Sequence, residues 1–121
     1  MLELRSIADR GNFAKERITL RVIADADVGD FLLLQTNMVG EDLSTQVRHA
    51  FWFPYQRVSR GDLVVVYTKY GIPSSKPLKV KGNAHFFFFD LSESIWGNQN
   101  RGAVLLHAPS WEWKRSKDLW K

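Results

Sequence analysis

The segment Phe51-Trp52-Phe53-Pro54-Tyr55 is followed shortly by Arg60-Gly61-Asp62-Leu63-Val64-Val65-Val66-Tyr67-Thr68. Aromatic and β-branched residues favour the half-buried surface of a sheet, and a Gly-Asp pair between two apolar runs marks a chain reversal. We therefore expect an aromatic strand and a valine-rich strand that pair across a turn at Gly61-Asp62. Neither segment carries a catalytic motif, so together they predict a scaffold rather than a reaction.

Apolar alternation predicts further strands on both sides of this pair. The remaining expected β segments are Leu2 to Ile7, Ile18 to Ile23, Phe31 to Thr36, Val47 to Phe53, Leu78 with Val80, His85 to Phe89, and Ala103 to His107. Phe31 to Thr36 is continuously apolar and should be a central strand, while Pro54 should end its strand or lie at an edge. Residues 37–45 and 70–77 are expected to be loops. No long helical pattern interrupts this series, which predicts an all-β fold.

Length and composition favour one domain. The chain has 121 residues with 45% hydrophobic content, which suffices for a single core. Residues 1–121 should therefore form one β-sandwich domain, immunoglobulin-like or a related Greek-key sandwich, in which residues 111–121 are a tryptophan-rich basic tail. Without cysteine there is no disulfide and no thiolate metal site. The start of the chain lacks a signal-peptide pattern and no stretch is apolar enough for a membrane span, so we expect a cytoplasmic protein without a membrane partner.

Several short motifs occur in an order that resembles the lamin tail domain. They are Phe31 to Asn37, Leu43-Ser44, Phe53-Pro54, Val58 to Val66, and Ile95 to Asn98 followed by Gly102 to Leu106. The resemblance covers about residues 17 to 110. It departs from the family at Thr45-Gln46-Val47, where a Gly-Trp pair is usual. The resemblance implies an immunoglobulin-like β-sandwich and an interaction or DNA-associated module rather than an enzyme.

The aromatic run Phe86 to Phe89 is the first candidate surface. Successive strand residues point to opposite faces, so four rings cannot all enter one core unless both faces are covered. Phe86 and Phe88 are thus candidate binding residues for a protein partner or a second copy. The tail tryptophans Trp111 and Trp113 are candidate binding residues as well. Alternatively the chain covers the phenylalanines itself, and Trp111, Trp113 and Trp120 are the natural covers.

Basic residues beside aromatic ones form the second candidate surface. The loop contributes Lys76, Lys79 and Lys81, preceded by Lys69 between Tyr67 and Tyr70, and the tail contributes Lys114 and Arg115. Lysine charges on phosphates and rings on bases suit single-stranded nucleic acid. The alternative interpretation is an ordinary solvated surface, because lysines at an exposed edge also keep a sheet from pairing with another chain.

Other polar residues give weaker signals. Asp25, Asp27 and Asp30 resemble the opening of a calcium loop but lack its glycine and its bidentate glutamate, so a turn explains them as well. Trp96 lies in a polar segment that is either a recognition loop or a turn anchored in the core. The three histidines, His49, His85 and His107, lack metal-ligand spacing.

These patterns leave three functional hypotheses. The favoured one is a non-enzymatic interaction module that presents an aromatic and basic surface to a protein partner or to its own copy. The alternatives are a nucleic-acid-binding domain and an enzyme whose site is assembled only in three dimensions. No catalytic residue, metal or cofactor is predicted.

Overall fold

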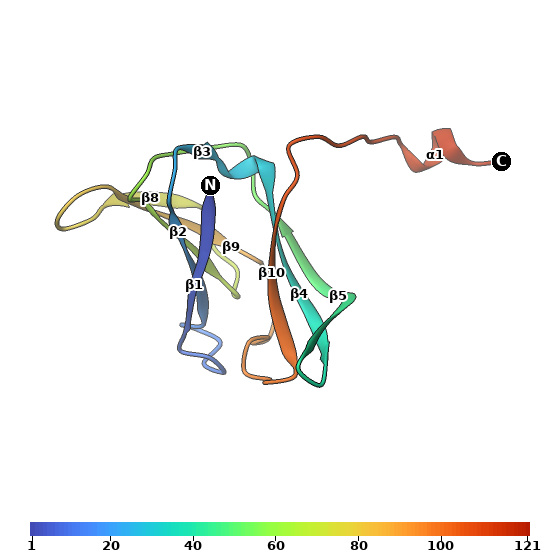
Figure 1. Cartoon of the computed structure of the whole chain (residues 1–121), viewed down its shortest axis with the longest axis horizontal. Coiled ribbons are helices and arrows are strands. Elements are labelled where there is room, and N and C mark those ends of the chain that lie inside the picture. Colours follow the sequence, from blue (N-terminus) through green and yellow to red (C-terminus); the bar gives the residue numbers. More distant parts are fainter.

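The computed structural model describes residues 1–121, which form two facing sheets whose strands are mostly antiparallel (Figure 1). The first sheet has five strands in the order β1 (Leu2–Ala8), β2 (Arg17–Val22), β7 (Leu63–Tyr67), β9 (Asn83–Phe88) and β8 (Ser74–Pro77). The second has three strands in the order β10 (Arg101–His107), β4 (Phe31–Val39) and β5 (Asp42–Trp52). Short β3 (Ala26–Asp27) pairs with β6 (Arg57–Val58), next to the 3-10 helix η1 (Val28–Asp30). The predicted all-β sandwich, of the immunoglobulin-like or Greek-key kind, is confirmed.

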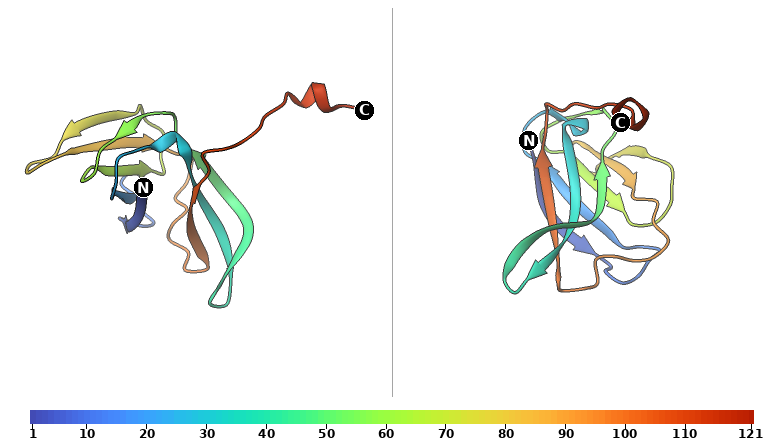
Figure 2. Two further views of the ribbon diagram at one scale, coloured as in Figure 1. Left: turned by 45° about the horizontal axis from the view of Figure 1, so that its top comes forward. Right: turned by 90° about the vertical axis from the view of Figure 1, so that its right-hand side faces the viewer.

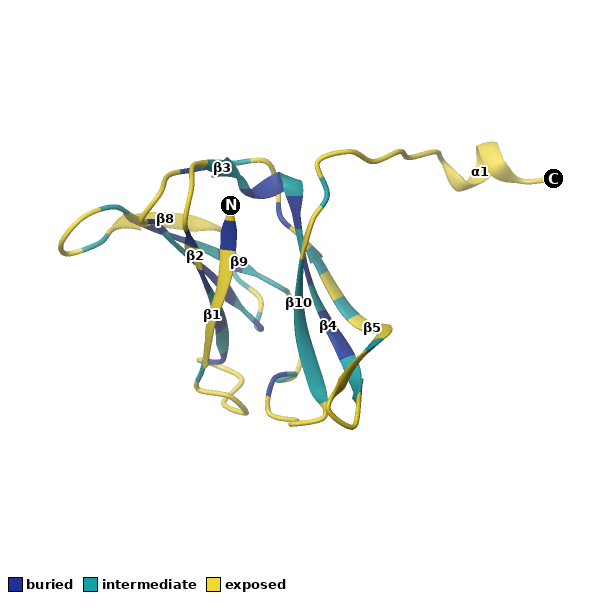
Figure 3. Cartoon of the chain, viewed as in Figure 1, coloured by how far each residue is buried: buried dark blue, intermediate teal, exposed yellow.

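Inward-facing side chains of both sheets form one apolar core between them. Leu20, Val64 and Val66 of the first sheet pack with Phe31 and Leu33 of the second, and all are essentially inaccessible to solvent. Buried residues occur along the strands of both sheets, whereas residues 111–121 of the tail are exposed throughout (Figure 3). Burial of this core is the main stabilising term, because the chain has no disulfide.

The strand predicted to be central, Phe31 to Thr36, is central in the second sheet as the first part of β4. Its odd positions, Phe31 and Leu33, point into the core, while Leu32 and Leu34 are half-buried on the outer side. The prediction for Pro54 is also confirmed, because β5 ends at Trp52 and forms the edge of its sheet.

The predicted pairing of the aromatic strand with the valine-rich strand is wrong. The aromatic residues belong to β5 and its end, the valines belong to β7, and these strands lie in different sheets. Residues 59–62 do form a turn with Gly61 at φ +94°, but β6 precedes that turn and leads the chain from one sheet to the other. Phe51 and Phe53 instead meet Phe87 across the core, at centroid distances of 6.3 and 5.3 Å.

Two predicted loops contain strands. Residues 37–39 belong to β4 and residues 42–45 to β5, and the hairpin between these strands turns at Gly40, whose φ of +61° suits glycine. Residues 74–77 form the edge strand β8, although they are exposed as expected. Conversely, Leu78 and Val80, predicted to be β material, lie in the turn between β8 and β9. The chain passes from β7 to β8 at the edge of the sheet, and β9 then occupies the position between them. Strand β9 is therefore antiparallel to β8 and parallel to β7.

The tail leaves the end of β10 and extends away from the domain on the outer side of the three-stranded sheet (Figures 1 and 2). It carries one short helix, α1 (Ser116–Leu119), held by a 3.8 Å ion pair between Arg115 and Asp118. No helix in the structure has the length and apolar content needed to cross a membrane.

Candidate functional site

Three aromatic rings lie on the outer face of the five-stranded sheet. Register pairs Tyr67 of β7 with Phe88 of β9, and the two rings stack at 5.5 Å with 15° between their planes. Phe86 lies one step along the same face, 6.4 Å from Tyr67. Phe86 and Phe88 are half-buried, whereas Phe87 enters the core, so the alternation expected of the phenylalanine run is present.

Three cations lie over these rings. The Nζ of Lys76 is 5.5 Å from the centre of Phe86, and the Nζ of Lys69 is 5.2 Å from the centre of Tyr67. The guanidinium of Arg17, on neighbouring β2, is 5.9 Å from the same tyrosine ring. Each such contact contributes about 0.5–1 kcal/mol at an exposed site. We call these six residues, Arg17, Tyr67, Lys69, Lys76, Phe86 and Phe88, the aromatic-basic face.

The chain covers part of this face, but not with the expected tryptophans. Gly71, in the loop after β7, lies so close to Phe88 that a Cβ there would come within 2.2 Å of its ring. The loop backbone therefore shields Phe88. Trp111 lies elsewhere, at 4.8 Å from Trp52 of β5, and its indole N–H donates to the Tyr55 hydroxyl over 3.2 Å.

The other predicted site residues are scattered. Lys79 and Lys81 are exposed in the turn between β8 and β9. Trp113, Lys114 and Arg115 are exposed in the tail, away from the aromatic-basic face. Trp96 is 6% exposed and belongs to the core, so its ring is not offered to a partner.

Sequence reasoning did not identify Arg17 as part of a site. It lies about fifty residues before Tyr67 in the chain and reaches the ring because β2 pairs with β7, with Arg17 opposite Tyr67. No sequence signal marks that pairing. Tyr67 and Lys69 are close in the sequence, within the basic stretch, and the structure brings both to the face.

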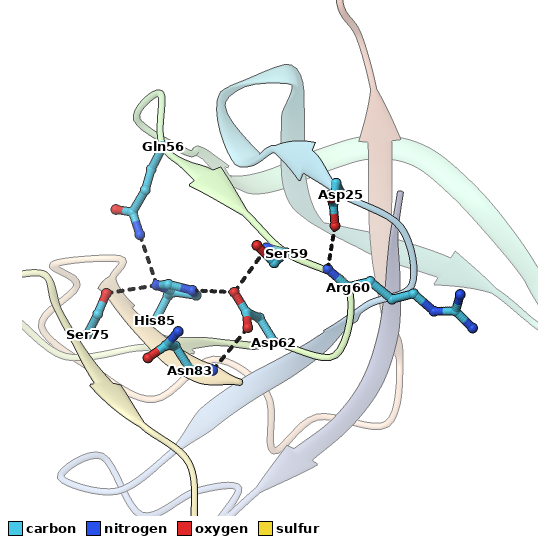
Figure 4. A network of polar contacts seen from close by, with 8 residues as sticks. All are labelled: Asp25, Gln56, Ser59, Arg60, Asp62, Ser75, Asn83 and His85. Carbon is cyan, nitrogen blue, oxygen red and sulfur yellow. Dashed lines mark hydrogen bonds and ion pairs between the residues drawn. The ribbon is translucent and has the colours of Figure 1, made fainter. Parts of the chain in front are cut away.

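A second polar cluster lies at the inner side of β7, β9 and β8 (Figure 4). The Oδ2 of Asp62 accepts a hydrogen bond from the Nε2 of His85 over 2.8 Å. The Nδ1 of His85 in turn lies 2.7 Å from the Ser75 hydroxyl and 3.0 Å from the Gln56 amide nitrogen. The Gln56 amide nitrogen can only donate, so Nδ1 is the acceptor in that contact.

Asp62 also holds two backbone segments. Its carboxylate accepts from the N–H of Ser59 and from the N–H of Asn83, each at 3.0 Å. Burial acts to raise the pKa of Asp62, but the N–H of Ser59, the His85 ring and the N–H of Asn83 outweigh it and hold the pKa below its ordinary value of 3.8.

The order serine, histidine, carboxylate resembles that of a hydrolase triad, but its surroundings differ. No cavity in the structure is lined by Asp62, Ser75 or His85. The Gln56 amide shares Nδ1 with the serine, and a nucleophile requires a base that is free to take its proton. The hydrogen bonds of the cluster connect β8, β9 and the residues just before β6 and β7.

The remaining polar candidates stabilise turns. Asp27 caps η1 by accepting from the N–H of Gly29 at 2.8 Å, and it also accepts from Gln56 at 2.9 Å. Asp25 accepts from the N–H of Arg60 at 2.8 Å. No group of three histidine, aspartate or glutamate side chains converges in the structure as a metal site would require.

No family model matches the sequence, and neither a curated protein nor a solved structure matches it.

Proposed function

We propose that this chain is a non-enzymatic interaction module that presents its aromatic-basic face to a partner protein with acidic side chains. The observation that carries the proposal is the placement of Arg17, Lys69 and Lys76 over the rings of Tyr67 and Phe86. Aromatic and arginine side chains are enriched in protein interfaces, where rings supply contact area and cations attract carboxylates.

The non-enzymatic part of the proposal is supported by the closed hydrogen bonding around His85, which leaves no open position for a substrate. The resemblance to the lamin tail domain, itself part of the proposal, favours the same class of function. That family resemblance implies a module that works beside other units.

The second candidate is a protein that binds single-stranded nucleic acid. It is favoured by the same cation and ring pairs, because bases stack on exposed rings while lysines contact phosphates. Lys79 and Lys81 are exposed next to β8, the strand that carries Lys76, and would extend the basic track.

One titration tests both candidates. The ¹⁵N-labelled chain is titrated with polyglutamate and, separately, with a mixed-sequence single-stranded oligonucleotide, while backbone amide shifts are followed by NMR. We expect polyglutamate to shift amides of Tyr67, Phe86 and Phe88, and the shifts to vanish in the double variant Lys69→Glu, Lys76→Glu. Arg48→Glu, on exposed β5 of the other sheet, is the matched control.

The outcomes separate the two candidates. Binding of the oligonucleotide but not of polyglutamate replaces the first candidate by the second, and its affinity should then fall steeply with salt. If neither ligand shifts the face, or if the double variant binds as well as the control, both proposals are wrong.

A further inference from the structure

The outer face of the three-stranded sheet carries an apolar groove that no part of the chain covers. Cross-strand partners Leu106 with Leu32, and Val104 with Leu34, place apolar side chains side by side on this face. The groove has a volume of about 290 Å³ and is lined mainly by Leu34, Thr36, Leu43, Val47, Val104 and Leu106. Leu43, Val47 and Leu106 are 51%, 48% and 42% exposed. A contiguous exposed apolar patch on a soluble domain marks an interaction site.

The floor of the groove has an unsatisfied polar atom. Thr36 is buried, yet its hydroxyl has no hydrogen-bond partner, which costs on the order of 1–3 kcal/mol. Gly102 lies opposite it in the register, and a Cβ there would come within 2.9 Å of Leu43 and 3.3 Å of the Thr36 hydroxyl. Because Gly102 has no side chain, the Leu43 side chain has room to pack next to Thr36. A side chain with a large apolar surface, such as an indole, suits a groove lined in this way.

The tail of the same protein has the matching chemistry. Trp113, Leu119 and Trp120 are 73%, 61% and 75% exposed and have no cover in their own chain. Trp111 already packs on Trp52, which is the cross-strand partner of Leu32 and therefore lies on the grooved face. Trp111 is thus in contact with the face that contains the groove, at Trp52.

Direction and charge favour a second copy as the source of the occupant. The tail projects outward from the grooved side, toward any molecule that faces it (Figure 2). The tail has four basic and two acidic residues and so a net positive charge. This charge is complementary to the acidic tip of the β4–β5 hairpin, Glu41 and Asp42, which is next to Leu43. From Trp111 to Trp120 an extended chain can reach roughly 30 Å, enough to cross to a facing domain.

We propose that residues 113–120 of one copy dock in this groove on a second copy, and that the exchange is reciprocal. Reciprocal exchange gives a closed two-fold dimer in which both tails are covered. The groove lies on the opposite side of the sandwich from the aromatic-basic face, so the dimer forms whether or not that face binds its partner.

The oligomeric state of the full chain tests this, by size-exclusion chromatography with light scattering over a range of concentrations. We expect a monomer–dimer equilibrium that is weakened about tenfold or more by Trp113→Ala with Trp120→Ala, as for aromatic anchors in other interfaces. The exposed tail can be changed without affecting the folding of the domain. Val47→Glu in the groove should act likewise, while Ile72→Glu, 81% exposed on a distant loop, is the control.

Crosslinking distinguishes exchange from a tail that folds onto its own domain. Because the chain has no cysteine, single substitutions Thr45→Cys in the groove and Lys117→Cys in the tail can be placed on separate chains and mixed under oxidising conditions. A disulfide-linked pair of the two variants, more abundant than either variant linked to itself, supports the proposal. The proposal is wrong if the protein is a monomer at all concentrations, or if its dimer is unaffected by the tail and groove variants. It is also wrong if a chain that carries both cysteines forms the disulfide internally while the mixed single variants form none.

Discussion

The hydroxyl of Thr68 donates a 2.5 Å hydrogen bond to the carboxylate of Glu16, which joins the end of β7 to the start of β2 in the interior. The same carboxylate accepts from the N–H groups of Gly11, Ile95 and Trp96 at 2.9, 3.0 and 3.2 Å. Glu16 has no exposed surface. A buried charge is tolerated when its oxygens are satisfied, and here one side chain connects three separate loops at one end of the sandwich.

Replacing Glu16 with glutamine should destabilise the protein by about 3 kcal/mol, because hydrogen bonds to a charged acceptor are lost and the new NH₂ group faces donors. Urea unfolding followed by circular dichroism would report a lower midpoint with an unchanged slope. Glu3→Gln, on exposed β1, is the matched control and should stay within about 0.5 kcal/mol of the wild type. Equal midpoints for the two variants would show that the loops are held by other contacts.

Acid should destabilise the fold through the same group. Burial acts to raise the pKa of Glu16, but the N–H of Gly11, the Thr68 hydroxyl and the N–H groups of Ile95 and Trp96 outweigh it, so the pKa lies below its ordinary 4.5. The unfolded chain therefore takes up the proton first as pH falls. The stabilisation is complete above about pH 5 and is lost as pH falls through the folded pKa. Unfolding free energies measured between about pH 7 and pH 3 should decline less in Glu16→Gln than in wild type, and parallel curves would contradict the assignment.

The Asp62 and His85 pair should contribute to stability rather than to chemistry. Asp62→Asn removes the charge that accepts from His85 and two backbone N–H groups, and we expect a loss of about 2 kcal/mol. Ser75→Ala should cost no more than about 0.5 kcal/mol, because Ser75 is exposed and Gln56 still contacts Nδ1. Thermal or urea unfolding checks both. A large loss in Ser75→Ala with none in Asp62→Asn would reverse the roles given to them.

The fold class was predictable because burial leaves a local pattern. The continuous run from Phe31 and the valines from Leu63 identify central strands wherever they end up in the fold. Sheet membership was not predictable in the same way. The aromatic residues near Phe51 and the valines of β7 were expected to pair, but short β6 between them carries the chain from one sheet to the other, and a two-residue strand leaves no pattern.

The candidate site was predictable only in part for the same reason. Alternation along β9 separates Phe86 and Phe88 from Phe87, and this needs no partner strand. The approach of Arg17 to Tyr67 depends on which strands are neighbours. The partners of His85 come from β8, from the residue before β7 and from the residue before β6, so no spacing in the sequence could reveal that network.

Gly29 should control how Trp111 sits on the domain. A Cβ at Gly29 would come within 2.4 Å of the Tyr55 ring and 2.8 Å of its Cα, so Gly29→Ala must displace Tyr55. We expect a loss of about 1–3 kcal/mol, typical of overpacking, in urea unfolding. Since the Tyr55 hydroxyl accepts from the Trp111 indole, the NMR resonance of that N–H should also shift toward the value of a solvated indole. Gly97→Ala is the matched control, because its nearest neighbour would be 3.7 Å away in ordinary contact. A Gly29→Ala protein with an unchanged midpoint and an unchanged indole resonance would mean that Tyr55 is not what positions the first tail tryptophan.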